Sequence, residues 1–175
     1  MIAVDLDDVV AGYVTACIDR YGYPVVWSWD LREMWPLVNW DAHFEETAHG
    51  AFLLGLRPIE GAREGCELLS KDLLYLTASK ESSMSVRKLW LKIHDFPSAP
   101  LICTGGFDNK AKWLQDNAGE VKGLIEDLPS VLEAAHDAGI YTVVMDTPWN
   151  RSVRSGKRVR TWSEAVKLFG MPRMP

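Results

Sequence analysis

The stretch Ile2-Ala-Val-Asp5-Leu-Asp7-Asp-Val-Val10 decides the fold, because a short apolar run leads directly into three aspartates within four positions. An apolar run without alternation is typical of a strand that is covered on both faces. Asp5 and Asp7 lie two positions apart, so both side chains point to the same face of an extended chain. The stretch therefore predicts a buried strand that ends in a pair of carboxylates.

Further apolar runs follow along the chain, and amphipathic segments separate most of them. The predicted strands cover residues 2–6, 73–77, 100–103, 123–126 and 140–145. The predicted helices cover residues 61–70, 86–93, 111–117 and 130–138. Strands and helices that alternate in this way predict an α/β fold, namely a doubly wound, Rossmann-like, five-stranded parallel sheet.

One interval breaks this alternation. About 65 residues separate the first two predicted strands, which is far more than one crossover helix needs. Residues 61–70 can supply that helix, and nine of the eighteen aromatic rings fall within residues 13–52. We therefore predict a small helical cap at residues 13–55, inserted after the first strand into a core formed by residues 1–12 and 56–175.

Composition excludes several classes of protein. No run approaches the roughly 20 apolar residues that cross a bilayer, and the N-terminus lacks the features of a secretory signal. The three cysteines, Cys17, Cys66 and Cys103, are odd in number and far apart, which favours reduced thiols and a cytoplasmic location over a disulfide framework. The chain thus reads as one compact domain of 175 residues with no membrane partner.

Charge is distributed unevenly along the chain. The net charge is −5, although residues 151–175 hold seven basic residues against one acidic residue. An acidic chain is a poor binder of nucleic-acid backbone, so we expect no stable nucleic-acid complex. The basic run 151–160 is either a solvated loop or a contact for a phosphate-bearing ligand.

Polar residues follow the ends of four predicted strands, where open α/β sheets bind their ligands. In chain order they are Asp5, Asp7, Asp8, Thr77, Lys110, Glu126 and Asp127. Clustered carboxylates require a cation at neutral pH, and oxygen ligands are typical of Mg2+. A hydroxyl and an ammonium group opposite the ion would hold phosphoryl oxygens, so the pattern predicts phosphoryl transfer.

Each of these residues has an ordinary explanation when it is taken alone. An isolated Asp-x-Asp is usually a turn or a helix cap, and a lone lysine is usually solvated. Lys112 is also an equal rival of Lys110 by residue type. Their order at successive strand ends is what favours a site over these explanations.

The same segments resemble the motifs of the haloacid dehalogenase superfamily of phosphatases. The matching segments are the aspartate stretch 2–10, the run that ends at Thr77, Lys110 before a helix, and the run that ends at Glu126-Asp127. The chain is most similar to the 5′(3′)-deoxyribonucleotidase branch, also called C-type 5′-nucleotidases. That likeness rests on the inserted cap, on Arg57-Pro-Ile-Glu-Gly61-Ala62, on Leu74-Tyr-Leu-Thr-Ala-Ser79, and on Pro148-Trp149-Asn150-Arg151 with Trp162.

The resemblance implies a role for each residue of the site. Asp5 would be the nucleophile that becomes an aspartyl-phosphate, and Asp7 the acid and base. Thr77, Ala78 and Lys110 would bind phosphate, and the Mg2+ ligands would be Asp5, Asp7 (through its backbone carbonyl) and Asp127. Glu126 would stand behind these ligands. The Glu-Asp pair replaces the Asp-Asp pair frequent in this branch, which leaves open which acid contacts the metal.

The resemblance also implies a small phosphate ester as substrate, and a (deoxy)nucleoside monophosphate in particular. Trp27, Trp29 and Trp35 are candidates for stacking on a base, and Arg151 for reaching the phosphate or sugar. The alternative is that all three rings belong to the core of the cap. Another small ester, a receiver-like phospho-acceptor and a nucleotide-binding module remain open as functions, and a homodimer is one arrangement open to the chain.

Overall fold

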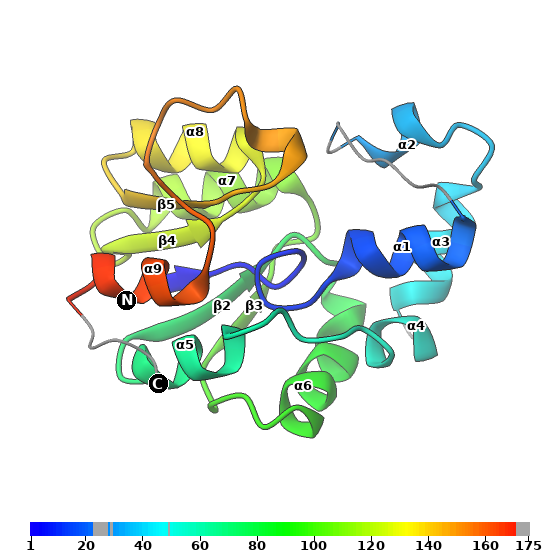
Figure 1. The fold of residues 1–175 in the computed structure, drawn as a ribbon, viewed down its shortest axis with the longest axis horizontal. Helices are drawn as coiled ribbons and strands as arrows, with labels where there is room; N and C mark the ends of the chain where they lie inside the picture. The colour runs from blue at the N-terminus through cyan, green and yellow to red at the C-terminus, as the bar shows by residue number, and fades with distance from the viewer. Residues whose placement is uncertain (23–27, 29, 49, 171–175) are drawn as a thin grey trace.

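A six-stranded sheet forms the centre of the protein in a computed structural model that describes residues 1–22, 28, 30–48 and 50–170 (Figure 1). Its strands are β1 (Ile2–Val4), β2 (Leu73–Thr77), β3 (Leu101–Cys103), β4 (Gly123–Glu126), β5 (Tyr141–Met145) and β6 (Lys157–Val159). Their order is β3-β2-β1-β4-β5-β6, and every neighbouring pair is parallel. The predicted doubly wound α/β fold is confirmed.

Helices cover both faces of the sheet (Figure 1). α7 (Phe107–Asp116) and α8 (Pro129–Asp137) lie on one face, while α5 (Ala62–Leu68), α6 (Met84–Ile93) and α9 (Trp162–Leu168) lie on the other. Alternate residues of one strand enter different cores. Val4 packs on the side of α5 and α9, whereas its neighbour Ala3 packs on the side of α7 and α8. Burial on both faces explains why the strands read as continuous apolar runs.

The sheet has one more strand than the five predicted from the sequence. β6 lies at the edge and falls in the basic run 151–160, where Lys157 and Arg158 are exposed and Val159 is buried. Arg158 also donates hydrogen bonds to Asp146 Oδ1 (2.7 Å) and Asn150 Oδ1 (2.6 Å). The expected solvated loop was therefore wrong for this part of the run, because charged residues on an edge strand hide its apolar pattern.

The described part of residues 13–55, which we call the cap segment, contains four helices. They are α1 (Tyr13–Tyr21), α2 (Leu31–Met34), α3 (Trp40–Ala48) and α4 (Ala51–Leu54), and they lie together to one side of the sheet (Figure 1). Trp35 and Trp40 are buried with Cys17 and Met34, and their two rings stack with centroids 5.8 Å apart. These tryptophans thus form the interior of the cap segment.

His43 lies in this interior and links two helices of the cap segment. Its Nε2 is 2.8 Å from the hydroxyl of Tyr13, and its Nδ1 is 2.8 Å from the hydroxyl of Tyr21. Burial, with a smaller contribution from Arg20, lowers the pKa of His43 to about 4. A neutral imidazole offers one donor and one acceptor, so it can satisfy both hydroxyls.

Cys17, Cys66 and Cys103 form no disulfide, as the sequence predicts. Over the described ranges, every helix is too short or too polar to cross a bilayer.

Gly65 of α5 tests the packing between α5 and α9. A Cβ at this position would lie 2.2 Å from Cε3 of Trp162, whose ring is fixed by a hydrogen bond from Nε1 to the Val9 carbonyl (2.8 Å). We expect Gly65→Ala to lower the free energy of unfolding, because overpacking costs about 1–3 kcal/mol and outweighs the roughly 1 kcal/mol of helix propensity gained. Urea denaturation measures the change.

The control is Gly119→Ala, where a Cβ meets no atom within 4 Å. Equal stability of the two variants would contradict the packing described here.

Candidate active site

The candidate site lies at the carboxyl end of the sheet, between β1 and β4. The chain passes from β1 to β2 on one side, and β4 then pairs with the other side of β1. Ligands of open α/β sheets bind where the strand order reverses in this way. Asp5 directly follows β1, and Glu126 ends β4, so the topology brings residues 121 positions apart to one crevice.

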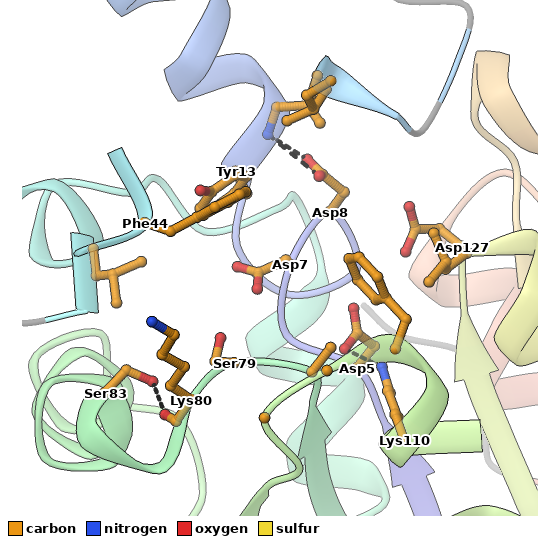
Figure 2. Close-up of a pocket in the computed structure, with 18 of the residues that line it drawn as sticks. Asp5, Asp7, Asp8, Tyr13, Phe44, Ser79, Lys80, Ser83, Lys110 and Asp127 are labelled. Atoms are coloured by element: carbon orange, nitrogen blue, oxygen red, sulfur yellow. Dashed lines mark hydrogen bonds and ion pairs between the residues drawn. The ribbon is translucent and has the colours of Figure 1, made fainter. Parts of the chain in front are cut away.

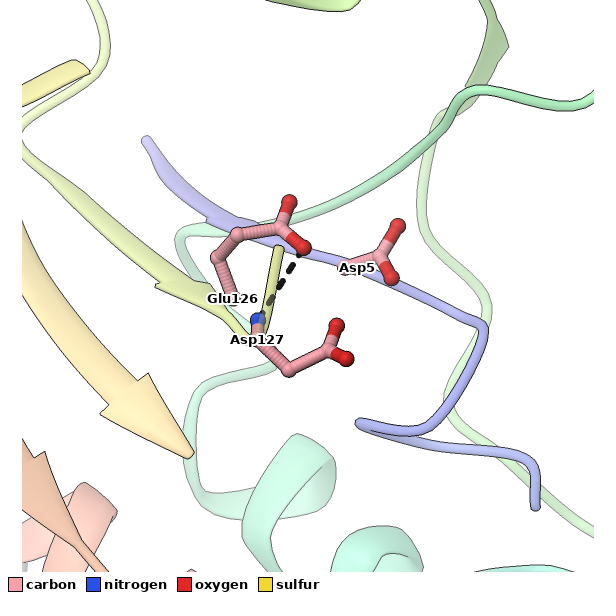
Figure 3. A group of neighbouring side chains, drawn as sticks. All are labelled: Asp5, Glu126 and Asp127. Atoms are coloured by element: carbon pink, nitrogen blue, oxygen red, sulfur yellow. Dashed lines mark hydrogen bonds between the residues drawn. The ribbon is translucent and has the colours of Figure 1, made fainter. Parts of the chain in front are cut away.

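Three buried carboxylates converge there (Figure 3). Asp5, Glu126 and Asp127 each offer one oxygen, and these oxygens all lie within 4.8 Å of one another. Hard divalent cations take such carboxylate ligands at close range. The donors of this three-acid group therefore fit a metal ion, and the sequence had predicted that these strand ends would meet.

The pKa values of two acids in this group show that ionised carboxylates here need a positive charge nearby. Burial, with a further contribution from Glu126, raises the pKa of Asp5 to about 8, and Lys110 opposes this rise. Burial likewise raises the pKa of Asp127 well above its usual value, with Glu126 as the next cause. Both acids resist ionisation because the charges are buried close together. A bound cation would favour the ionised forms.

Glu126 is already engaged through both of its oxygens. Oε1 accepts hydrogen bonds from the backbone amides of Asp127 (3.0 Å) and Leu128 (3.1 Å), and Oε2 lies 2.5 Å from Nζ of Lys110. These contacts hold the turn after β4 and the lysine in place. These contacts thus suit Glu126 to a supporting role behind the metal ligands.

The structure distinguishes the two candidate lysines. Lys110 of α7 is buried and makes ion pairs with both Asp5 and Glu126. Burial alone would lower the pKa of Lys110, but these two carboxylates raise it above its usual value. The side chain of Lys112 is 73% exposed and pairs with Asp116 at 3.0 Å. Lys110 is therefore the lysine within the site.

Asp7 has a different partner, one that the sequence analysis missed. Arg87 of α6 donates from Nη1 to Oδ1 of Asp7 (2.7 Å) and from Nη2 to Oδ2 (2.6 Å). Nη2 also donates to Oγ of Ser79 (2.8 Å). A positive charge near the N-terminus of a helix is unfavourable, because that end of the helix dipole is itself positive. The place of Arg87, four residues into a helix, is therefore the sequence signal that could have marked it.

Thr77 and Ala78 follow β2 at the same edge of the sheet. Thr77 is fully buried, and its hydroxyl donates to Ser79 Oγ (3.0 Å) and accepts from the Ser79 amide (3.2 Å). Ala78 lines the pocket itself. The loop after β2 is thus held by its own hydroxyl groups next to the aspartates.

A pocket of about 720 Å3 joins the strand ends to the cap segment (Figure 2). The three aspartates of the β1 loop line it together with Asp127, and Figure 2 shows the carboxylate of Asp8 turned toward the start of α1. Tyr13 and Phe44 line it from the cap segment. An ion pair between Lys80 and Glu45 (2.6 Å) connects the loop after β2 to α3. The pocket is therefore built by both parts of the chain.

Asp8 fixes the start of the cap segment. Its backbone is left-handed (φ 59°), and its Oδ1 accepts a hydrogen bond from the amide of Val14 (2.9 Å) in α1. Burial raises the pKa of Asp8 well above its usual value, and Asp7 adds to the effect. The aspartate loop is thus tied directly to the first helix of the cap segment.

Of the four residues predicted to contact the substrate, two lie outside the described residues and two do not line the pocket. Trp27 and Trp29 lie outside the described residues. Trp35 is 2% exposed within the cap segment and is not among the described residues that line the pocket. Arg151 is exposed and also lies away from the lining. Trp149 does line the pocket, and its Nε1 donates to Oδ2 of Asp127 (2.8 Å).

Comparison with known proteins gives one family match. The family model described as "5′ nucleotidase, deoxy (pyrimidine), cytosolic type C protein (NT5C)" matches residues 1–173. No curated protein matches the chain.

Several solved structures are similar in fold. A haloacid dehalogenase-like hydrolase family protein from Streptococcus pneumoniae is 11% identical with a TM-score of 0.64, over 96% of this chain and 97% of that chain. A HAD-superfamily hydrolase (subfamily IA, variant 1) from Geobacter sulfurreducens PCA is 15% identical with a TM-score of 0.62, over 95% and 97%. A HAD family hydrolase from Deinococcus radiodurans R1, with bound phosphate and sodium, is 14% identical with a TM-score of 0.60, over 94% and 92%. At these identities the likeness shows the fold.

The raised pKa of Asp5 gives the ion-free protein a distinct pH dependence of stability. An unfolded chain releases this proton near pH 4, whereas the folded protein keeps it up to about pH 8. Between these values the folded state binds more protons, so its free energy of unfolding falls as the pH rises. We expect Tm in EDTA to fall from about pH 5 to about pH 8, and MgCl2 to raise Tm more at the higher pH.

Asp5→Asn is the matched variant for this measurement, since it removes the titrating group and keeps the side-chain shape. Its Tm should depend less on pH and respond less to MgCl2. NaCl at equal ionic strength controls for screening. A gain in Tm that is the same at both pH values and in both proteins would contradict ion binding at this site.

Proposed function

The chain belongs to the family of cytosolic type C deoxy (pyrimidine) 5′-nucleotidases and is a hydrolase of phosphate monoesters, and from this premise we propose that it dephosphorylates (deoxy)nucleoside monophosphates with the help of Mg2+. Family membership confirms the predicted resemblance and favours an enzyme over a receiver-like phospho-acceptor. The observation that carries the proposal is the convergence of Asp5, Glu126 and Asp127 at the carboxyl end of the sheet, where Lys110 pairs with the first two.

Asp5 acts as the nucleophile in the proposed reaction. Its carboxylate oxygen attacks phosphorus while the bond from phosphorus to the ester oxygen breaks, and Asp7 gives a proton to the leaving alcohol. In the second step water attacks the aspartyl-phosphate and gives a proton back to Asp7. The bond to Asp5 breaks, and inorganic phosphate leaves. The position of both side chains on one loop facing the pocket supports these roles.

Lys110 and the loop after β2 are the proposed phosphate contacts. The ammonium group has three donors, and its ion pairs with Asp5 and Glu126 use two of them. The third is suited to a phosphate oxygen. The Thr77 hydroxyl and the backbone amide of Ala78, at the end of β2, are proposed to bind the others. These groups neutralise charge that develops during transfer.

The proposed metal ligands are Asp5, Asp127 and the backbone carbonyl of Asp7, with Glu126 supporting them. When bound, Mg2+ would supply positive charge to the phosphoryl oxygens. The support for this is the donor set itself, because it consists of buried carboxylate oxygens whose pKa values are raised. Trp149 holds one oxygen of Asp127, which leaves the other to face the ion.

The cap segment is the proposed selector of the substrate. The pocket has the size of a small-molecule site, and Tyr13, Phe44 and Trp149 line it beside the aspartates. Aromatic rings next to a phosphate site suit a planar base that is joined to a sugar phosphate. The unpaired Cys17, Cys66 and Cys103 support the proposal that this reaction takes place in the cytoplasm.

Loss of the nucleophile tests the reaction. We expect Asp5→Asn to lower phosphate release from a deoxynucleoside monophosphate by at least about 10³-fold, because a carboxamide cannot form the covalent intermediate. Release should also require MgCl2 and stop in EDTA. The measurement is a steady-state phosphate assay on folded protein. Asp137→Asn, on the exposed side of α8, is the control and should keep wild-type rates. Full activity of Asp5→Asn would refute the assignment.

A substrate panel tests the cap segment. We expect kcat/KM for deoxynucleoside monophosphates to exceed that for ribose 5-phosphate and glycerol phosphate by about 10- to 100-fold, since stacking of a base contributes about 1–3 kcal/mol. Phe44→Ala should reduce this preference and leave the sugar phosphates little affected. Equal rates across the panel would remove base recognition from the proposal and leave a general phosphatase.

A further inference from the structure

We propose that Arg87 is a positioning residue that orients the carboxylate of Asp7 for proton transfer to the leaving group. This inference deepens the proposed function and rests on it, because it concerns the residue assigned as acid and base. Among the described residues, Arg87 makes its hydrogen bonds to Asp7 and Ser79 and not to the nucleophile or the three-acid group.

The contact between the two side chains is bidentate and directional. Two parallel N–H···O bonds of 2.7 and 2.6 Å join the guanidinium to both oxygens of Asp7. Such a pair fixes the plane of the carboxylate as well as its position, which a single contact does not do. The side chain of Arg87 is 5% exposed and that of Asp7 is 28% exposed. The pair is therefore anchored on the inner side and open to the pocket on the outer side.

The open side of Asp7 is the one that the reaction uses. Each carboxylate oxygen has two lone pairs, and Arg87 takes one on each oxygen. One lone pair remains on each oxygen, and Asp7 lines the pocket near Ser79 (Figure 2). An oxygen in that position can hold the transferable proton against the ester oxygen, provided that the carboxylate does not rotate.

Arg87 is itself held firmly. It lies one turn before Trp90 in α6, and the Trp90 indole donates a hydrogen bond to the carbonyl of Leu56 (2.9 Å), which directly follows the cap segment. Ser79 takes a third hydrogen bond from the guanidinium. The orientation of Asp7 is thus set by a helix packed on the core and by the loop after β2.

Direct binding of the substrate phosphate by Arg87 fits the geometry less well. Nη1 and Nη2 point to Asp7 and Ser79, and Nε is buried with no hydrogen-bond partner among the described residues. Arg87 lines the pocket, but three of its five N–H donors are taken by Asp7 and Ser79. Lys110 occupies the corresponding place beside Asp5.

The leaving group provides the test. A nucleoside alkoxide needs a proton to leave, whereas 4-nitrophenolate leaves without one. We expect Arg87→Gln to lower kcat/KM for a deoxynucleoside monophosphate by about 10- to 100-fold and for 4-nitrophenyl phosphate by less than about 3-fold, since general acid catalysis contributes about 10²–10⁴-fold. The ratio kcat/KM covers the chemistry up to the first bond cleavage, so it isolates this step.

Two further variants keep the test decisive. Arg87→Lys retains the buried charge beside Asp7, which preserves the fold, but it replaces the fork with a single contact; its loss on the nucleotide should be intermediate. Arg87→Ala should regain nucleotide hydrolysis when guanidinium ion is added at non-denaturing concentration. Lys88→Gln, an exposed cation on the same helix, should match wild type on both esters. Circular dichroism and thermal melts check that each variant is folded.

The outcomes separate the two proposals. An equal loss on both esters would overturn positioning by Arg87, and so would a rise in KM for both esters with kcat unchanged, which indicates phosphate binding. If wild-type protein releases no phosphate, or if release survives Asp5→Asn, the proposed function fails first. Asp5-dependent activity with an equal loss in the Arg87 variants rejects only the positioning role.

Discussion

Repulsion among buried carboxylates is the constraint on which the rest of the site depends. Asp5, Asp7, Asp8, Glu126 and Asp127 line one pocket, and the buried cations beside them are Lys110 and Arg87. Such an excess of negative charge is unfavourable in a poorly solvated place, as the raised pKa of Asp5 indicates. The fold maintains it because parallel strands end at the same edge and bring their polar ends together. The same excess makes the pocket attractive to a divalent ion.

The two buried cations divide the aspartates between them. Lys110 pairs with Asp5 and Glu126 from α7, on one face of the sheet, and Arg87 pairs with Asp7 from α6, on the other. Neighbouring residues of one short loop thereby gain different surroundings. Different surroundings are what allow chemically identical side chains to take the separate roles of nucleophile and proton carrier.

Sequence alone predicted the parts of the fold that leave a local signal. The strands β1, β2 and β4 follow from apolar runs buried on both faces, and their polar ends predicted the meeting of Asp5 with Glu126 and Asp127. β6 was missed because its exposed basic residues carry no alternation. The partner of Asp7 was missed because Arg87 lies 80 positions away, and only packing brings it near.

The tryptophans show a second limit of prediction from the sequence. A ring that stacks on a ligand and a ring that stacks on another ring have the same sequence pattern. Trp35 proved to belong to the interior of the cap segment. His43 in that interior has a consequence of its own. Histidine commonly acts as an acid sensor, but here burial, with a smaller contribution from Arg20, lowers the pKa of His43 to about 4, and the neutral ring joins two tyrosine hydroxyls. The hydrogen bonds that join α1 to α3 through His43 therefore keep the same protonation state over the range of pH that a living cell undergoes.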